Sequence, residues 1–143
     1  MNLRYATMCS GIEAVSVAAE PLGWRPVVFS EIEPFPCSVL AHHYPEVPNV
    51  GDMTAVDWSA YRNRVDVLIA GTPCQAFSVA GARRGLADAR GNLSLVFTRA
   101  VDDIDPLVTI WENVPGVLSS KDNAFGCFLA GLAGEDAPFD APR

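Results

Sequence analysis

The chain has 143 residues, the length of one ordinary domain, and half of them are apolar, which is enough to build a core. Its formal net charge of −7 is unfavourable for a protein that must hold a polyanion unaided. The apolar runs are no longer than strands, and the N-terminus lacks the apolar segment of a signal peptide, so we expect a cytoplasmic chain that does not span a membrane. Four scattered cysteines without a C-x-x-C pair argue against a metal site and a disulfide framework.

In chain order, the predicted elements alternate between strands and helices. Strands are expected at residues 4–8, 26–30, 65–70 and 107–111, with a short strand or extended link at 47–52. Helices are expected at residues 12–22, 34–44 and 92–104 and beyond residue 121, with a brief helical turn within 54–61. The buried face of the first helix is expected to carry Val15, Ala18, Ala19 and Leu22. This alternation predicts an α/β fold with a mostly parallel sheet and helices on both faces.

The apolar run at residues 65–70 stops abruptly at Gly71 and Pro73, so Cys74 follows the carboxyl end of a predicted strand. In open α/β sheets, ligands and reactive groups gather at that end of the strands. Free cysteines are also among the most buried and inert residues. Position alone therefore leaves two interpretations of Cys74, a buried thiol and a nucleophile.

The first strand, the turn Cys9-Ser10-Gly11 and the helix after it resemble a nucleotide-binding beginning. Only one glycine of the G-x-G-x-x-G fingerprint is present, so NAD is disfavoured. Glu31, at the end of the second strand, can accept hydrogen bonds from both hydroxyls of a ribose. Asp52 can accept one from an adenine amino group, and Ile32 can cover a face of that ring. The alternatives are a helix-start acid for Glu31 and an N-cap for Asp52.

Two segments resemble motifs of the cytosine-C5 DNA methyltransferases. Gly71-Thr72-Pro73-Cys74-Gln75-Ala76-Phe77-Ser78 resembles their nucleophile segment, and Glu112-Asn113-Val114, after a strand, resembles their Glu-Asn-Val motif. The two motifs in this order are far more specific than either alone, and the resemblance extends from Tyr5 to about Phe128. It implies the Rossmann-like fold of S-adenosylmethionine-dependent methyltransferases, in an incomplete form.

The resemblance implies S-adenosyl-L-methionine as the cofactor and no metal. The implied cofactor-binding residues are Cys9, Ser10, Gly11, Ile12, Glu31, Ile32, Asp52, Met53, Gly71, Pro73 and Leu95. The first turn departs from the family's F-x-G-x-G pattern, because Cys9 replaces the aromatic residue and Glu13 replaces the second glycine.

The implied reaction is methylation of a flipped cytosine through a covalent adduct of Cys74 at carbon 6. Glu112 is the acid that stabilises the ring at N3 and the exocyclic amine, and Asn113 orients the loop around Pro73 or Cys74. Arg90 is a phosphate or loop-locking contact. The implied nucleic-acid contacts are Gln75, Ser78, Arg83, Arg84 and Arg90. Residues 73–101 contain four arginines and one aspartate, a local charge of +3, although an ordinary solvated loop would look alike.

We expect residues 1–133 to form a partial catalytic domain and residues 134–143 a turn-rich, disordered tail. The family's Gln-Arg-x-Arg segment and target-recognition region are not found. The chain is therefore either truncated or split from a second chain, and we expect it to be weak or inactive alone. Its expected partner is double-stranded DNA, through the complete enzyme.

Three other functions stay open at this point. One is methylation of cytosine C5 in RNA, although the residues after Cys74 favour DNA. Another is a non-catalytic module that binds the cofactor or a partner. A cysteine hydrolase is disfavoured, because the histidines that would serve as its base, His42 and His43, lie late in the second helix. The target sequence, and an origin in a restriction-modification system or a phage, also stay open.

Overall fold

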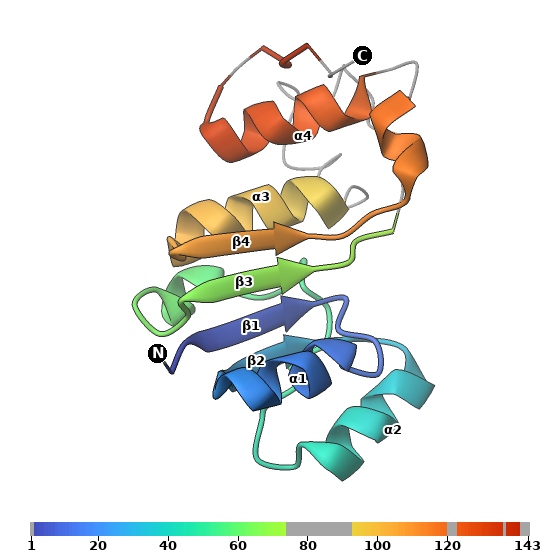
Figure 1. Cartoon of the computed structure of the whole chain (residues 1–143), viewed down its shortest axis with the longest axis vertical. Helices are drawn as coiled ribbons and strands as arrows, with labels where there is room; N and C mark the ends of the chain where they lie inside the picture. The colour runs from blue at the N-terminus through green and yellow to red at the C-terminus, as the bar shows by residue number, and fades with distance from the viewer. Residues whose placement is uncertain (1, 74–92, 120–122, 136, 141–143) are drawn as a thin grey trace.

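The computed structural model describes residues 2–73, 93–119, 123–135 and 137–140. Within them, four strands form one parallel sheet in the order β2-β1-β3-β4 (Figure 1). The strands are β1 (Arg4–Met8), β2 (Arg25–Ser30), β3 (Val67–Ala70) and β4 (Val108–Trp111). The predicted parallel α/β architecture is confirmed.

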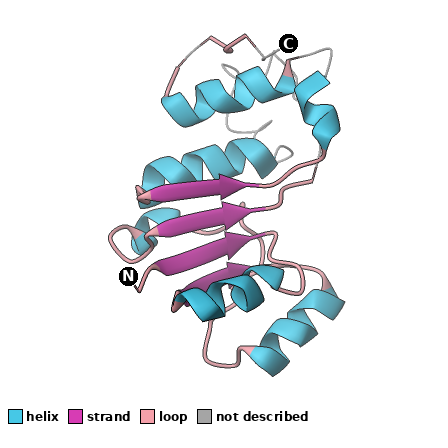
Figure 2. Ribbon diagram, in the orientation of Figure 1, coloured by secondary structure: helices cyan, strands magenta, loops and turns pink. Residues whose placement is uncertain are grey.

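The helices follow the strands in alternation, as Figure 2 shows. They are α1 (Ala14–Ala19), α2 (Pro34–His43), α3 (Leu93–Ile104) and α4 (Ala124–Ala133), with 3₁₀ turns at Glu20–Leu22, Trp58–Tyr61 and Pro115–Ser119. Pro34 begins α2, where its missing N–H costs nothing. Residues 47–52 form an extended link that touches the sheet through a single bridge between Phe29 and Asn49.

Both faces of the central strands β1 and β3 are covered, because alternate strand residues enter two separate hydrophobic clusters. One cluster joins Ala6, Met8, Leu68 and Ala70 to Phe97, Ile104 and Phe128 of α3 and α4. The other joins Tyr5, Val67 and Ile69 to Ala19 of α1 and Leu40 of α2. Figure 1 accordingly shows α1 in front of the sheet and α3 behind it.

The first helix differs from its prediction. It begins only at Ala14, because Glu13 has a left-handed backbone with φ of 65°, and its last turn is 3₁₀. Ala18 and Leu22, expected on the buried face, are exposed. Ala19 is buried, and Val15 is half-buried against the same cluster, as predicted. The other buried positions are Ser16 and, just before the helix, Glu13, which apolar periodicity missed because both are polar and pair with neighbouring polar groups.

The strands end in register, which places the following loops together. Met8 pairs with Ser30 on one side and with Ala70 on the other, and Ala70 pairs with Trp111. The chain therefore leaves all four strands at one edge of the sheet. The chain places β2 on one side of β1 and then β3 on the other side, so the strand order reverses at β1. Such a reversal opens a crevice between the loops that follow the strands.

The described part of the predicted tail returns to α4. The backbone N–H of Phe139 donates to the carbonyl of Gly126 at 3.2 Å, and Asn123 donates to the carbonyl of Phe139 at 2.8 Å. A Cβ on Gly126 would overlap that carbonyl, so glycine permits the close approach.

Candidate active site

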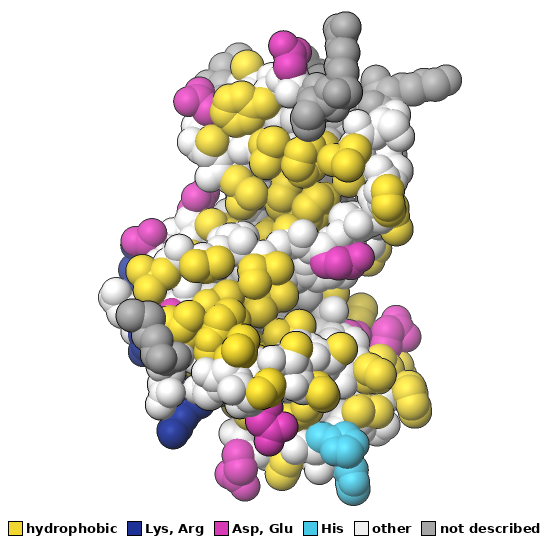
Figure 3. All heavy atoms as spheres, in the orientation of Figure 1, with side chains coloured by type: hydrophobic (Ala, Val, Ile, Leu, Met, Phe, Trp, Pro, Cys, Tyr) yellow, Lys and Arg dark blue, Asp and Glu magenta, His cyan; other side chains and the backbone are white. Residues whose placement is uncertain are grey.

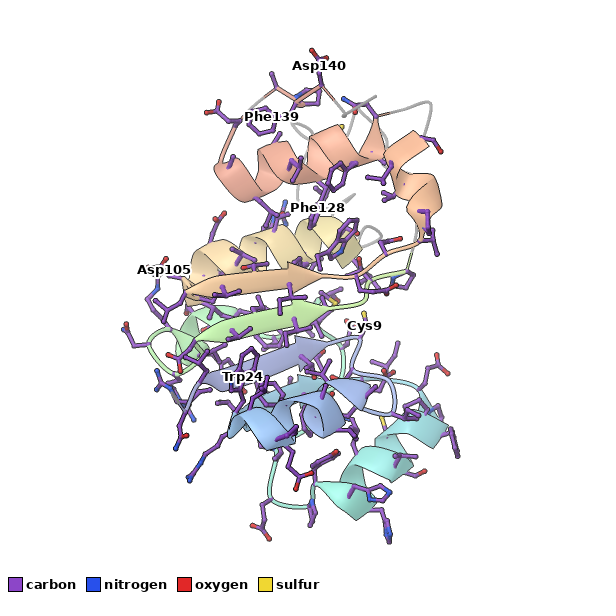
Figure 4. The ribbon with its side chains drawn as sticks, viewed as in Figure 1. Cys9, Trp24, Asp105, Phe128, Phe139 and Asp140 are labelled. Carbon is purple, nitrogen blue, oxygen red and sulfur yellow. The ribbon has the colours of Figure 1, made fainter. Side chains whose placement is uncertain are left out.

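A cavity of about 270 Å³ lies at the carboxyl edge of the sheet, a size near the lower end of the roughly 300–1,000 Å³ usual for small-molecule sites. Its described lining residues are Cys9, Ser30, Glu31, Ile32, Glu33, Gly51, Asp52, Met53, Gly71, Pro73 and Leu93. They come from the end of β2, from the loops that follow β1, β2 and β3, from the link after α2 and from the start of α3. Figure 4 shows Cys9 directly after β1, at this edge.

Glu31 is the most firmly held side chain of the cavity. One carboxylate oxygen accepts the Gly11 N–H at 2.7 Å. The other accepts the N–H groups of Ile32 and Glu33, each at 2.8 Å. Three backbone donors fix the position of the charge and occupy three of the roughly four acceptor sites of the carboxylate, so the oxygen that binds Gly11 keeps one site for a hydroxyl group of a ligand.

Asn49 connects this acid to the loop that carries Asp52. Its side-chain oxygen accepts the N–H of Glu31 at 3.0 Å and that of Gly51 at 3.2 Å, and its amide donates to the Glu31 carbonyl. One oxygen of Asp52 accepts the Thr54 N–H at 2.8 Å. This contact closes a turn and not a helix N-cap, because the next helical turn begins at Trp58 and is capped by Asp57. The other oxygen of Asp52 has no hydrogen bond among the described residues and is exposed.

Two sulfur atoms line another part of the cavity. The thiol of Cys9 lies 3.7 Å from the thioether sulfur of Met53, which is buried. Burial, and secondarily the charge of Glu31, raises the pKa of the Cys9 thiol to about 11. The thiol is therefore neutral near pH 7 and acts as an apolar wall rather than as a nucleophile.

A set of polar contacts holds the backbone just before Cys74. The Trp111 indole N–H donates to the Thr72 hydroxyl at 2.8 Å, and the Ser94 hydroxyl lies at the same distance. The Asn113 amide donates to the Thr72 carbonyl at 3.0 Å. A Cβ on Gly71 would stand 3.3 Å from a carboxylate oxygen of Glu112, so that acid lies against the segment three residues before Cys74.

The structure brings together most of the described residues expected at the cofactor site. Seven of them line the cavity: Cys9, Glu31, Ile32, Asp52, Met53, Gly71 and Pro73. Ser10 and Gly11 support it by hydrogen bonds, whereas Ile12 is exposed and Leu95 is replaced as a lining residue by Leu93. Cys74, Gln75, Ser78, Arg83, Arg84 and Arg90 lie outside the described residues.

Sequence reasoning missed Ser30, Glu33, Asn49, Gly51 and Leu93. The first two flank Glu31 and Gly51 precedes Asp52, so adjacency to a predicted site residue was the available signal. For Asn49 there was no signal, because its role depends on the bridge that brings it beside β2.

Comparisons with known proteins identify the family. The profile described as "C-5 cytosine-specific DNA methylase" matches residues 3–134. The chain belongs to this family. It is 42% identical over 111 residues to the type II methyltransferase M.Eco47II of Escherichia coli, covering 77% of this chain and 27% of the relative. It is 34% identical over 122 residues to M.HhaI of Haemophilus parahaemolyticus, covering 85% and 36%.

Solved structures of the same fold support this assignment. A DNA modification methyltransferase encoded within an E. coli prophage superimposes with a TM-score of 0.73 at 24% identity, over 93% of this chain and 38% of that one. Spodoptera frugiperda DNMT2 gives 0.68 at 25% identity, over 92% and 41%. The fold is therefore the Rossmann-like fold of S-adenosylmethionine-dependent methyltransferases.

One relative carries a different activity in its name. The "DNA N-6-adenine-methyltransferase" of Escherichia phage P1 is 59% identical over 151 residues, spanning 97% of this chain but 20% of that protein. This chain thus spans about a fifth to a third of the length of the curated relatives named here. Within the part that the structure describes, no helix is long and apolar enough to cross a membrane, and no three His, Cys, Asp or Glu side chains group as metal ligands.

Proposed function

We propose that this chain carries the cofactor-binding and nucleophile-bearing part of a methyltransferase that modifies carbon 5 of cytosine in DNA. The observation that carries the proposal is a convergence at one sheet edge. The Glu31 cavity, the Glu112 carboxylate and the fixed backbone at Thr72 all lie where the strands end, directly before the cysteine of the Pro-Cys-Gln motif.

The side chains of the cavity fit S-adenosyl-L-methionine. The Glu31 oxygen that binds Gly11 keeps an acceptor site for a ribose hydroxyl, and the unpaired oxygen of Asp52 offers one to the adenine amino group. Ile32, which is 64% exposed beside the cavity, is positioned to cover the adenine ring. When bound, this cofactor supplies the transferable methyl group.

The residues before and after the cysteine suit a covalent mechanism. The Cys74 thiolate forms a bond to carbon 6 of the cytosine, which places electron density on carbon 5. Glu112 steadies the ring by a proton at N3 and a hydrogen bond to the exocyclic amine. After carbon 5 gains the methyl group, loss of its proton restores the double bond and expels the cysteine. Asn113 contributes by holding the backbone two residues before Cys74, because its side-chain amide donates to the Thr72 carbonyl.

The proposed substrate is double-stranded DNA bound by the complete enzyme. A thiolate cannot reach carbon 6 inside a stacked duplex, so the base must be flipped out at a cost of a few kcal/mol. Gln75, Ser78, Arg83, Arg84 and Arg90 are the proposed contacts to the nucleic acid. A net charge of −7 implies that further basic groups come from elsewhere in that enzyme.

Methylation of adenine N6 is the second candidate, because the phage P1 relative bears that name. It needs no cysteine adduct, since the adenine amino nitrogen is itself the nucleophile. The adduct therefore separates the two candidates.

The test uses this chain joined to the remaining residues of M.Eco47II, after cofactor binding has been verified by calorimetry. The fusion is incubated with S-adenosylmethionine and duplex DNA containing 5-fluorocytosine, whose carbon 5 has no proton to lose. We expect a protein–DNA adduct at Cys74, and none with Cys74→Ser. Methylated adenine in ordinary DNA, or methylation that survives Cys74→Ser, would overturn the proposal.

A further inference from the structure

Glu13 is the one fully buried acid among the described residues, with 0% of its surface exposed. It stands where the family pattern has a glycine, and its φ of 65° is the backbone that favours glycine. A buried charged group in a strained backbone persists only where its surroundings hold it. Glu13 does not line the cavity, so direct contact with the cofactor does not account for it.

The hydrogen bonds of Glu13 form two relays of hydroxyl groups. One carboxylate oxygen accepts the Thr7 hydroxyl at 2.8 Å, and the Thr7 oxygen lies 2.7 Å from the Ser10 hydroxyl. The other carboxylate oxygen accepts the Ser16 hydroxyl at 3.1 Å, and the Ser16 oxygen lies 2.5 Å from the Tyr5 hydroxyl.

The two oxygens of Glu13 accept hydrogen bonds from Thr7 and Ser16; burial raises the pKa of this carboxyl, and these bonds counter the rise. Ser10 connects the first relay to further backbone groups. It accepts the Ser30 N–H at 3.1 Å, and its hydroxyl lies 3.2 Å from the Thr7 carbonyl and 3.3 Å from the Ser30 carbonyl, either of which can accept its hydrogen. The relay therefore holds Ser10, and with it the turn, in whichever direction its hydroxyl hydrogens point.

The first relay ends at the cofactor cavity. Ser30 directly precedes Glu31, and its own hydroxyl donates to the Gly51 carbonyl beside Asp52 at 2.6 Å. The same turn presents the Gly11 N–H to Glu31. The second relay ends at Tyr5 under α1 and reaches no described cavity residue.

We propose that Glu13 is a positioning residue, whose buried carboxyl group fixes the Cys9–Gly11 turn so that the Gly11 N–H and Ser30 set the geometry of the cofactor acid Glu31. The identity of the cofactor in this inference rests on the proposed function. The role of Glu13 in holding the turn rests on the hydrogen bonds alone. Glu13 therefore adopts the backbone conformation of the family's second glycine, and its side chain in addition holds the turn in place.

The test compares variants that break one relay at a time. Glu13→Gln removes the carboxylate, Thr7→Val breaks the relay toward the cavity, and Ser16→Ala breaks the relay away from it. Glu20→Gln, an exposed acid at the end of α1, is the charge control. The readouts are hydrogen exchange of the Gly11 amide, the affinity for S-adenosylhomocysteine, and the urea midpoint of unfolding.

We expect Glu13→Gln and Thr7→Val to speed Gly11 exchange and to weaken binding on the order of tenfold each, with a double variant no worse than either alone. Ser16→Ala should lower the urea midpoint and leave Gly11 exchange and affinity unchanged. The family residue in Glu13→Gly should bind as weakly as Glu13→Gln.

Two results would overturn the proposal: a Glu13→Gly variant that binds like the parent chain, or affinity that follows the urea midpoint in all variants. If the parent chain binds no S-adenosylhomocysteine, the proposed cofactor is wrong, and Gly11 exchange alone decides the role of Glu13.

Discussion

At the scale of single residues, Glu31 offers the most direct test of the cofactor site. Its oxygens accept three backbone N–H groups, and Glu31→Gln would turn an amide donor toward at least one of them. Since a hydrogen bond to a charged group contributes about 1.5–3 kcal/mol, we expect roughly 10- to 100-fold weaker binding of S-adenosylhomocysteine by calorimetry. Glu20→Gln should change nothing, and equal affinity of both variants would contradict the assignment of Glu31.

Trp111 permits a substitution that separates packing from hydrogen bonding. Its indole stacks on Phe128 with centroids 3.9 Å apart and donates to the Thr72 hydroxyl. Trp111→Phe keeps a ring against Phe128 and removes the donor, so we expect a loss of about 1 kcal/mol in the free energy of unfolding. In the fusion used for adduct trapping, slower adduct formation with unchanged cofactor affinity is expected. Parent-like trapping would show that Thr72 does not position the nucleophile segment.

Single residues were predictable where a local motif specified them. Glu31 follows the end of β2, and Asp52 follows an extended link that was expected at residues 47–52, so sequence position was enough to place both beside the cavity. Leu95 was expected there and Leu93 was found, because the start of α3 decides which residue faces the cavity. Asn49 and the inward side chain of Glu13 depend on contacts between segments distant in sequence, which no local pattern contains.

At the scale of elements, the packing of α4 on α3 and β4 depends on Phe128. This ring is 2% exposed and lies between Phe97 and Trp111, and Figure 4 shows it on the side of α4 that faces α3. Phe128→Ala removes a fully buried ring, so we expect destabilisation of about 3–5 kcal/mol in urea unfolding. Phe35→Ala, at a site 72% exposed, should cost less than about 0.5 kcal/mol. Similar losses in both variants would mean that α4 does not pack as described.

The starts of β1 and β3 are joined by Arg4 and Asp66. The backbone N–H and guanidinium of Arg4 donate to the Asp66 carboxylate at 2.8–3.0 Å, which lowers the pKa of that carboxyl below its usual value. A lowered folded-state pKa gives stability above the unfolded value of about 3.9, and this stability is lost as the pH falls through the folded-state pKa.

Calorimetry between pH 3 and pH 7 measures this contribution. Asp66→Asn should lower the Tm at pH 7 and flatten its decline as the pH falls from about 3.9 through the folded-state pKa, where the parent aspartate takes up its proton. Glu20→Gln, at an exposed acid whose side chain makes no hydrogen bond or ion pair with the described residues, should keep the parent profile. A parent-like acid limb in Asp66→Asn would show that the Arg4 contact does not stabilise the fold.

Elements with strong terminators were well predicted and the polar helix was not. Pro34 and Gly23 marked the start of α2 and the end of the first helical segment, and the apolar strands reached their expected places. In α1, Ala19 and Val15 lie on the inner side as expected, but the polar Ser16 is buried there, while the apolar Ala18 and Leu22 are exposed.

At the scale of the whole molecule, β4 is an edge of the described sheet, and one of its faces is uncovered. Val108 and Ile110 are 47% and 41% exposed, and they lie beside the exposed Leu107. Figure 3 shows hydrophobic side chains gathered on this side of the molecule, which α1 covers only in part. An apolar edge strand with free backbone groups pairs readily with another chain. We therefore expect the isolated 143-residue chain to associate with itself as its concentration rises, which light scattering after size exclusion measures.

A charge at this edge should prevent the association. Ile110→Lys places an ammonium group on the uncovered face, and we expect it to shift the chain toward the mass of a single copy at every concentration. Val17→Lys makes the same change of charge at a site on α1 that is 68% exposed and should leave the association as it is. If both variants became monomeric, net charge rather than the β4 edge would govern solubility. If neither did, the contact would lie on another surface.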